Sequence, residues 1–251
     1  MTPTPEFVLI VGASRGIGLA LTEALLARPQ TQHLFAASRM ASHSEQLRQL
    51  ASDHPGRLTA LAVDISDEDS IVAAIASLKQ HCDRLDWVIT TAGLLHDGKQ
   101  LAPERRLADV TARNILHSMT VNCVGPVLIA KHVAPLLPRQ EPCIIANLSA
   151  RVGSIEDNRL GGWYAYRAAK AAQNMLTRNL SIELKRRNRK IRCVALHPGT
   201  VDTDLSAPFN ANSKTLFSVG QAAGYLLNVL DNLNDDDNGN FFAWDGQRIA
   251  W

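Results

Sequence analysis

The chain has 251 residues, of which 46% are hydrophobic, and a formal net charge of +2. This length and composition suffice for one substantial core, so we expect a single domain over residues 1–251. The small net charge disfavours a nucleic-acid partner, and no apolar stretch approaches the roughly 20 residues of a membrane helix. No basic segment followed by an apolar run opens the chain, so we expect a cytoplasmic protein without a secretory signal.

The cysteines and histidines show no pattern of a metal site or a disulfide framework. Cys82, Cys123, Cys143 and Cys193 are widely spaced and include no C-x-x-C pair, which is typical of buried thiols in a reducing compartment. The eight histidines lack metal-ligand spacings such as H-E-x-x-H. We therefore expect no bound metal.

The chain begins with a strand, a glycine turn and a helix. Residues 7–11 are apolar, residues 12–18 read Gly-Ala-Ser-Arg-Gly-Ile-Gly, and an amphipathic segment follows that ends before Pro29. Glycines allow positive φ angles and a close approach of backbone to ligand, and the helix N-terminus offers unpaired N–H groups. This stretch predicts a pyrophosphate-binding turn.

Two other interpretations fit the same turn. The spacing G-x-x-x-G-x-G differs from the common G-x-G-x-x-G fingerprint, so the glycines could be merely structural. Residues 12–16 also match G-x-S-x-G, the nucleophile elbow of serine hydrolases. That alternative needs an acid and then a histidine downstream, and the last histidine is His197.

Apolar strand-like segments alternate with helix-like segments to the end of the chain. The expected strands are 7–11, 33–38, 57–63, 85–91, 143–148, 191–196 and an edge strand at 241–243. After the first helix, the expected helices are 42–52, 67–80 with Ser66 as its cap, 111–137 with a kink at Gly125-Pro126, 163–187 and 219–230.

This alternation predicts an α/β fold, a Rossmann-type doubly wound parallel sheet of about seven strands with helices on both faces. Ligands of such sheets bind beyond the carboxyl ends of the strands. Gly12, Asp64, Gly93, Ser149 and Pro198 follow different expected strands, so we expect them to converge on one crevice.

A tyrosine and a lysine stand four residues apart on the helix expected at 163–187. Tyr166 and Lys170 therefore share a helix face, and a nearby ammonium favours the phenolate of a tyrosine. Tyr164 is a rival, but Ala168 stands where its lysine would be. The bland alternative is a pair of side chains that merely cover the helix surface.

Taken together in order, these motifs resemble the short-chain dehydrogenase/reductase family over nearly the whole chain. The matching residues are Gly12-x-x-x-Gly16-x-Gly18, Asp64, Ala92-Gly93, Asn122, Ser149, Tyr166-x-x-x-Lys170 and Pro198-Gly199. The resemblance implies reversible hydride transfer between a nicotinamide cofactor and an aldehyde or ketone.

The resemblance also assigns roles to four catalytic residues. Tyr166 would donate a proton to the carbonyl oxygen during reduction, and Lys170 would lower the Tyr166 pKa and bind the nicotinamide ribose. Ser149 would hold the substrate oxygen. Asn122 would position a water that joins Lys170 to solvent.

The cofactor would be held by residues at the ends of several strands. The expected set is Gly12, Ser14, Arg15, Gly16, Ile17, Gly18, Ser38, Arg39, Asp64, Ile65, Ala92, Gly93, Tyr166, Lys170, Pro198, Gly199, Val201 and Thr203. Asp64 and Ile65 match the position that contacts adenine in the family; Asp64 could instead be a helix N-cap.

Three departures from the family pattern stand out. Val11 replaces the usual threonine, and Thr90-Thr91 replaces an Asn-Asn pair, so hydrogen bonds that brace the sheet are lost. Ser149 also lies seventeen residues before Tyr166, about four more than is common in the family. The extra residues fall in a loop, so Ser149 remains the expected residue, with Ser154 as the substitute.

The sequence favours NADP(H) over NAD(H). An NAD site needs an acid about twenty residues past the glycines, and this position holds Ser38-Arg39. Arg15 adds a second cation, and the planar guanidinium suits a phosphate.

The substrate and partners are less narrowly defined. The segment at about 204–218 corresponds to the family's mobile substrate loop, and Leu94, Leu95 and Trp163 could add an apolar wall. In the family, the long helices that begin here at Thr111 and Trp163 form the dimer interface. We expect a homodimer or homotetramer, in which Leu176 and Leu180 either contact the partner or face the core.

The stretches 149–154 and 157–164 and the ending 245–251 resemble the C-factor-like and carbonyl-reductase-like branch. C-factor relatives are associated with cell–cell signalling. The alternative function is therefore a cofactor-binding signalling or sensor protein with little turnover.

Overall fold

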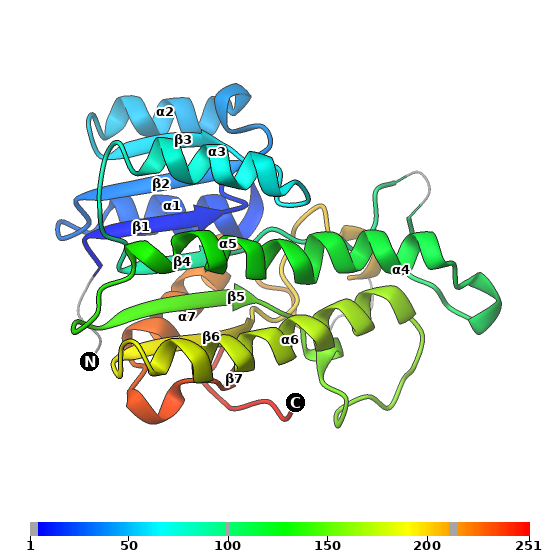
Figure 1. The fold of residues 1–251 in the computed structure, drawn as a ribbon. Coiled ribbons are helices and arrows are strands. Elements are labelled where there is room, and N and C mark those ends of the chain that lie inside the picture. The colour runs from blue at the N-terminus through cyan, green and yellow to red at the C-terminus, as the bar shows by residue number, and fades with distance from the viewer. Residues whose placement is uncertain (1–4, 99–100, 211–214) are drawn as a thin grey trace.

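The computed structural model describes residues 5–98, 101–210 and 215–251, and in them one parallel sheet organises the fold (Figure 1). Its strands lie in the order β3-β2-β1-β4-β5-β6-β7, and every pairing is parallel. They are β1 (Phe7–Val11), β2 (His33–Ser38), β3 (Leu58–Ala62), β4 (Trp87–Thr90), β5 (Cys143–Leu148), β6 (Ile191–His197) and β7 (Phe241–Ala243). The predicted sheet of about seven strands is confirmed.

Helices cover both faces of the sheet. One face packs against α1 (Gly16–Leu26), α2 (Glu45–Asp53) and α7 (Val219–Asp231). The other packs against α3 (Glu68–Leu78), α5 (Gly125–Val133) and α6 (Tyr164–Lys185), and α4 (Ala112–Met119) lies beside α6 (Figure 1). Strands buried on both faces are apolar along their whole length, which explains the continuous run of β1.

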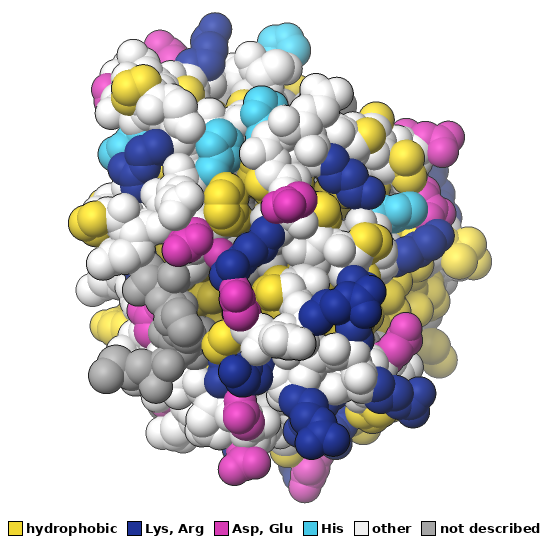
Figure 2. All heavy atoms as spheres, turned by 60° about the vertical axis from the view of Figure 1, so that its left-hand side comes forward, with side chains coloured by type: hydrophobic (Ala, Val, Ile, Leu, Met, Phe, Trp, Pro, Cys, Tyr) yellow, Lys and Arg dark blue, Asp and Glu magenta, His cyan; other side chains and the backbone are white. Residues whose placement is uncertain are grey.

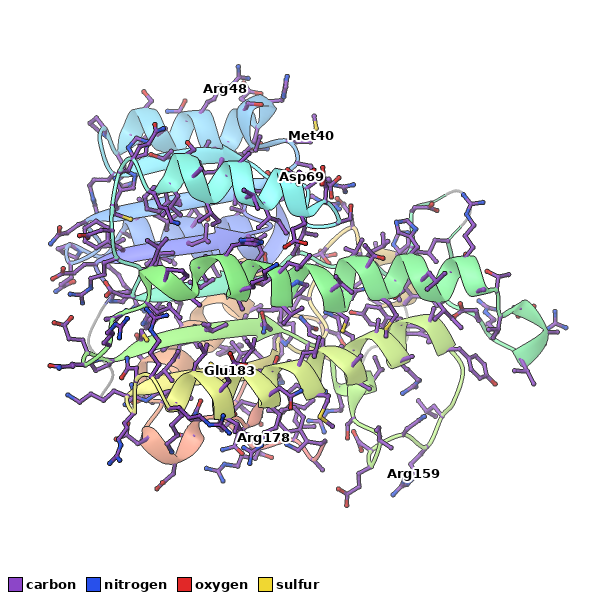
Figure 3. The ribbon with its side chains drawn as sticks, viewed as in Figure 1. Met40, Arg48, Asp69, Arg159, Arg178 and Glu183 are labelled. Carbon is purple, nitrogen blue, oxygen red and sulfur yellow. The ribbon has the colours of Figure 1, made fainter. Side chains whose placement is uncertain are left out.

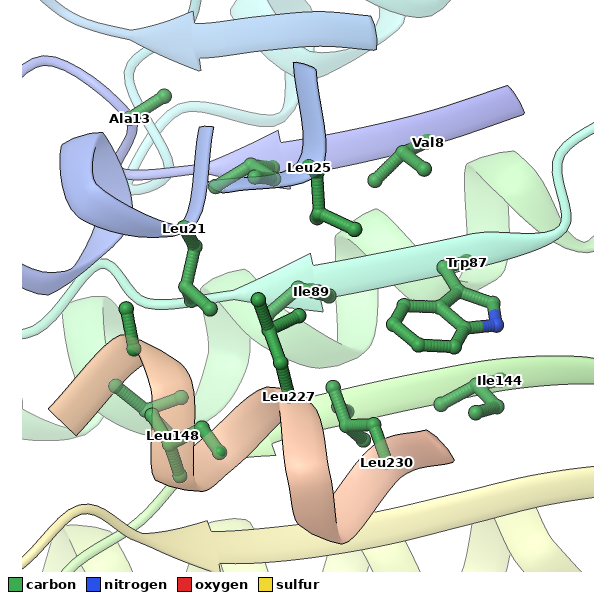
Figure 4. Close-up of a cluster of buried hydrophobic side chains, with 14 of the residues drawn as sticks. Val8, Ala13, Leu21, Leu25, Trp87, Ile89, Ile144, Leu148, Leu227 and Leu230 are labelled. Carbon is green, nitrogen blue, oxygen red and sulfur yellow. The ribbon is translucent and has the colours of Figure 1, made fainter. Parts of the chain in front are cut away.

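Two apolar clusters form the core. Val8 and Ile10 face the α1–α7 side, whereas Leu9 and Val11 face the α3–α5–α6 side, as strand alternation requires. Figure 4 shows the first cluster, in which side chains of β1, β4 and β5 meet leucines of α1 and α7. The largest member is Trp87, which is 1% exposed.

The strand order reverses between β1 and β4. The chain runs from β1 outward through β2 to β3, then crosses back to β4 and proceeds outward through β5, β6 and β7. A crevice forms where two such halves meet, beyond the carboxyl ends of the strands. The fold therefore places the end of β1 and the end of β4 beside each other.

Element boundaries agree with the sequence prediction to within about three residues, with one cap misassigned. Asp67, not Ser66, is the N-cap of α3, and its carboxylate accepts a hydrogen bond from the Asp69 N–H. Ser66 instead donates to Asp64 from both its N–H and its hydroxyl. Asp64 and Ser66 form a local turn, and Asp67, one residue later, has the extended backbone that an N-cap requires.

The helix predicted at 111–137 is interrupted earlier than expected. A π-helical turn at Thr120–Val124 separates α4 from α5, and a 3₁₀ turn at Ala134–Leu136 ends the run. The irregularity therefore precedes the predicted kink at Gly125-Pro126. Gly125 has a packing role, since a Cβ there would lie 2.5 Å from Ile65 Cγ1.

The segment that contains α4 and α5 corrects one expectation about membranes. Ala112–Leu136 is long and apolar enough to span a bilayer by length and mean hydropathy alone, contrary to the sequence estimate. Its window is 44% buried, and α5 packs on α3 and on the sheet, as core helices do. Figure 2 shows another face, where basic and acidic side chains alternate, in keeping with the small net charge.

Candidate active site

A cavity of about 1130 Å³ opens at the carboxyl ends of the strands. Small-ligand pockets measure roughly 300–1000 Å³, so this one has room for a dinucleotide and a substrate together. Its lining includes these expected residues: Gly12, Ser14, Arg15, Gly16, Ile17, Gly18, Ser38, Arg39, Asp64, Ile65, Ala92, Gly93, Ser149, Tyr166, Lys170, Pro198 and Thr203. Figure 3 shows Met40, another lining residue, at the same edge of the sheet as Asp69.

The glycine turn is packed too tightly for side chains. Gly12 has a φ of +99°, and a Cβ there would lie 2.6 Å from the Ala92 nitrogen. A Cβ on Gly18 would lie 2.2 Å from the Gly12 carbonyl oxygen. These glycines let α1 begin directly against the ends of β1 and β4, facing the cavity.

The N-terminus of α1 suits an anion. Its N-cap, Arg15, makes no side-chain cap, so the first-turn N–H groups lack the usual side-chain acceptor. Together with the helix dipole they form a phosphate cradle. The buried hydroxyl of Ser38, at the end of β2, also has no hydrogen-bond partner and lines the cavity. These residues fit a nicotinamide dinucleotide.

Two arginines surround the place expected for the adenosine ribose. Arg39 follows β2, is exposed, and lines the cavity. Arg15 also lines it and forms an ion pair with Asp204, with 2.6 Å between Nη1 and Oδ2. No carboxylate follows β2 directly, because Ser38 is succeeded by Arg39, Met40 and Ala41.

Asp64 lies at the end of β3 and keeps its charge. Burial alone would raise its pKa, but hydrogen bonds from the Ser66 hydroxyl and N–H, helped by Arg39, outweigh burial and lower it. Asp64 and Ile65 both line the cavity. Their contact with the adenine end of the cofactor stays a prediction.

Tyr166 and Lys170 lie on the buried side of α6, facing the end of β5. The Lys170 Nζ lies 5.7 Å from the centroid of the Tyr166 ring. It donates to the Leu148 carbonyl at 2.7 Å and to Gln173 Oε1 at 2.9 Å. The two side chains are thus adjacent, whereas Tyr164 is 40% exposed on the helix surface.

Burial acts on the two groups in opposite senses. It raises the pKa of Tyr166 well above its ordinary value, and it lowers the pKa of Lys170 to about 7, with Cys123 opposing the change slightly. Tyr166 is therefore protonated over the neutral range, and Lys170 is close to half charged. Desolvation is the cause of the raised Tyr166 pKa, and the lowering by Lys170 that the family resemblance implies stays a prediction.

Ser149 directly follows β5 and lines the cavity. Its hydroxyl donates to Asn174 Oδ1 at 2.6 Å, and Asn174 in turn donates to the Gly153 carbonyl. Ser154, the substitute considered from the sequence, is not among the lining residues and accepts a hydrogen bond from the Asp157 N–H. Of the two serines, the geometry therefore favours Ser149.

Three expected site residues lie behind the cavity wall. Asn122 accepts from the Leu94 N–H and donates to the Leu94 carbonyl and to Ser118, so its side chain braces the segment after β4. The water-positioning role expected for it has no support in these side-chain contacts. Gly199 packs beneath the rings of Phe217 and Trp244, and Val201 pairs with Phe217. These two hold the segment after β6 in place.

The start of α6 is held by a residue that the sequence did not indicate. The Glu104 carboxylate accepts from the Ala165 N–H at 3.1 Å, from 61 positions away, and its carbonyl accepts from the Trp163 N–H. Trp163, at a φ of +52°, caps the helix with its backbone only. An acid at a helix N-terminus is stabilising, so Glu104 fixes the turn that carries Tyr166.

Aromatic side chains gather next to Tyr166. Trp163 makes edge contacts with Tyr166 and with Phe209 of the segment after β6, at centroid distances of 6.3 and 5.1 Å. His96 contacts Phe209, and its Nε2–H donates a hydrogen bond to the Asp204 carbonyl oxygen. Of the expected wall, Leu94 lines the cavity and Leu95 is buried. Residues 211–214 of the expected loop at 204–218 lie outside the described residues.

The hydrolase interpretation gains no support. Ser14 has no hydrogen bond to a histidine among the described residues, and His197 does not line the cavity. Burial, and after it the positive charge of Arg151, lowers the pKa of His197 to about 4, so the imidazole is neutral at neutral pH. No group of three His, Cys, Asp or Glu side chains suited to a metal occurs in the described part of the chain.

Comparisons with known proteins agree with this geometry. A family model described as short chain dehydrogenase matches residues 6–214. A 1-hydroxy-2-glutathionyl-2-methyl-3-butene dehydrogenase of Rhodococcus is 30% identical over 97% of this chain and 99% of its own length. The C-signal of Myxococcus xanthus is 35% identical over 58% of this chain and 83% of its own. NADPH-bound carbonyl reductase from chicken fatty liver is 33% identical, with a TM-score of 0.87, covering 98% of this chain and 99% of that one.

Proposed function

This chain belongs to the short-chain dehydrogenase family of oxidoreductases, and we propose that it is an NADPH-dependent reductase of aldehydes or ketones. The observation that carries the proposal is the convergence of Tyr166, Lys170 and Ser149 on the cavity that also contains the phosphate cradle. The similarity to carbonyl reductases of known structure supports the same activity.

In the proposed reaction the cofactor, when bound, supplies the hydride to the carbonyl carbon. Tyr166 donates its phenolic proton to the carbonyl oxygen, which leaves an alcohol and a tyrosinate. The raised pKa of Tyr166 keeps the proton in place before reaction, which suits reduction. Lys170, one turn along α6, stabilises the tyrosinate when it is charged.

Ser149 would hold the substrate oxygen. Its hydroxyl proton points to Asn174 in this structure, so it must rotate about the Cβ–Oγ bond to donate to a substrate. The cost of this rotation is small because the hydroxyl exchanges one acceptor for another. Trp163 and Phe209 would provide the apolar wall for the body of the substrate.

We assign the cofactor preference to the two arginines at the cavity. Arg39 and Arg15 would bind the 2′-phosphate of NADPH, and no acid stands in the usual position to bind the ribose hydroxyls of NADH. The NADPH in the similar chicken enzyme supports this preference.

We also propose that the protein is cytoplasmic and that it self-associates. Leu180 is partly buried and packs against the core, which is one of its two expected roles; its contact with a partner stays a prediction. Other apolar side chains of the long helices are exposed, among them Leu116, Val124, Met175 and Ile182. A homodimer or homotetramer would cover them, and sedimentation of the purified protein would give its mass.

The similarity to C-signal favours one second candidate, a cofactor-binding signalling protein with little turnover. Both functions require NADPH binding, and only the reductase requires an acid at Tyr166. The retention of Tyr166, Lys170 and Ser149 around one cavity favours the enzyme.

The test is NADPH consumption with a panel of aldehydes, ketones and quinones. Tyr166→Phe should lower kcat by about 10²–10⁴ while NADPH still binds. Tyr164→Phe, on the exposed side of the same helix turn, is the matched control and should leave turnover unchanged. Tight NADPH binding without turnover of any carbonyl would favour the signalling protein, and activity in Tyr166→Phe would exclude Tyr166 as the acid.

A further inference from the structure

Gln173 follows Lys170 by one helical turn and contacts its amine. Its Oε1 accepts a hydrogen bond from Lys170 Nζ at 2.9 Å, and its side chain is 1% exposed. Resting on the reductase function proposed above, we propose that Gln173 is a positioning residue that holds the Lys170 ammonium with one N–H directed to the cavity. It does so together with the Leu148 carbonyl.

The contacts of Lys170 leave one donor free. An ammonium has three N–H donors, and the Leu148 carbonyl and Gln173 Oε1 take two of them. Gly153 packs against the Lys170 Cβ so closely that a Cβ there would lie 2.8 Å away, which confines the lysine stem. Since Lys170 lines the cavity, the third donor is the one available to a ligand.

The orientation of the Gln173 amide is fixed by its neighbours. The flipped amide would place an NH₂ group against the Lys170 ammonium, so Oε1 must face it. Its Nε2 is buried without a hydrogen-bond partner. A buried unpaired donor lowers stability, so an apolar side chain would suit the packing at this position better. The amide has one advantage over an apolar side chain, which is its hydrogen bond to Lys170.

Among the described residues, only neutral groups surround the Lys170 amine. The titratable groups that face it are Tyr166 on its own helix and Cys123 on the π-helical turn. From β5, the turn after β4 and the 3₁₀ turn at Arg151–Gly153 it meets Leu148, Gly93 and Gly153. No carboxylate pairs with Lys170 in the described ranges. Burial accordingly lowers the Lys170 pKa to about 7, and the Gln173 carbonyl dipole opposes this loss of charge.

The direct test is the pH dependence of Lys170 acetylation by acetic anhydride, followed by mass spectrometry, which reads the amine without any carbonyl substrate. Gln173→Glu places a carboxylate beside the amine and should raise the labelling midpoint by about one pH unit or more. Gln173→Leu removes the acceptor and should lower it. Thr177→Val, which removes a buried hydroxyl one turn further along α6, is the matched control and should leave the midpoint in place.

Turnover gives the second readout. At neutral pH, Gln173→Leu should lower kcat about tenfold with little change in KM, and the pH profile of kcat should move with the labelling midpoint. Unchanged midpoints in both Gln173 variants, or an equal shift in Thr177→Val, would overturn the proposal. Labelling shifts in a protein that reduces no carbonyl would refute the reductase function and still support Gln173 as the residue that holds Lys170.

Discussion

Arg15 in the glycine turn and Asp204 in the segment after β6 form an ion pair with 2.6 Å between Nη1 and Oδ2. Both residues line the cavity, so the pair ties the phosphate-binding turn to the expected substrate loop. Both side chains are largely exposed, and an exposed pair contributes at most about 1 kcal/mol to stability. A phosphate that needs Arg15 can therefore displace Asp204.

The first prediction concerns cofactor choice. Arg15→Gln should weaken NADPH binding about tenfold or more and NADH binding little, because only NADPH carries the 2′-phosphate. Asp204→Asn should strengthen NADPH binding severalfold, because Arg15 loses its competitor. Fluorescence titration of both cofactors measures the effect. Arg48→Gln, on the exposed side of α2 (Figure 3), is the control. Equal losses of NADPH and NADH binding in Arg15→Gln would contradict the assignment.

The second prediction compares two helical glycines. Gly18→Ala should lower the free energy of unfolding by about 1–3 kcal/mol, because its Cβ would collide with the Gly12 backbone. Gly224→Ala, in α7 with open space around it, should raise the free energy of unfolding by about 0.5–1 kcal/mol. Urea denaturation distinguishes the two. An undiminished stability of Gly18→Ala would mean that the turn can move away from α1.

The third prediction concerns stability and pH. The pKa of Lys170 is about 7 in the folded chain, whereas an unfolded lysine titrates near about 10.4. Between these values the unfolded state binds more protons, so stability should rise with pH. Stability from this group is complete above the unfolded pKa and is lost as the pH falls through about 7.

The useful window for this measurement is about pH 7 to 7.5, a pH unit below the pKa of about 8.5 at which thiols of the unfolded chain ionise. There the wild-type protein should gain stability with pH in chemical denaturation. Lys170→Met should reduce this slope. A slope that is the same in both proteins would mean that Lys170 remains fully charged in the folded state.

The fourth prediction concerns the substrate wall. Phe209→Ala removes the ring that contacts Trp163 and His96, so KM for aromatic carbonyls should rise about tenfold while kcat changes little. A short aliphatic aldehyde should show a smaller rise. Leu216→Ala, on an exposed apolar residue of the same segment, serves as the control. A fall in kcat without a change in KM would place Phe209 near the chemistry instead.

The strands and most of the cavity lining could be predicted from the sequence because local signals specify them. A strand buried on both faces is apolar throughout, as in β1, and the residue that follows a parallel strand must lie at the cavity edge. Asp64, Gly93 and Ser149 were placed correctly at that edge for this reason.

The remaining features depend on contacts between distant residues. Glu104 reaches the start of α6 across 61 positions, and no local pattern marks it as the partner of that helix. The Asn122 side chain binds Leu94 and Ser118, contacts that no local pattern marks, and its water-positioning role stays a prediction. Gln173 carries a signal that could have been used, because a polar residue on the buried face of a helix requires a partner.

The π-helical turn at Thr120–Val124 acts as a phase shift between α4 and α5. One additional residue in a helix advances the side chains that follow by about 100° around its axis. Val121 and His117 therefore face the cavity, while Ile129 and Val133 further along face the sheet. Deletion of one residue within the turn would restore a continuous α-helix and rotate the two halves out of register, so this segment should not tolerate a change in length.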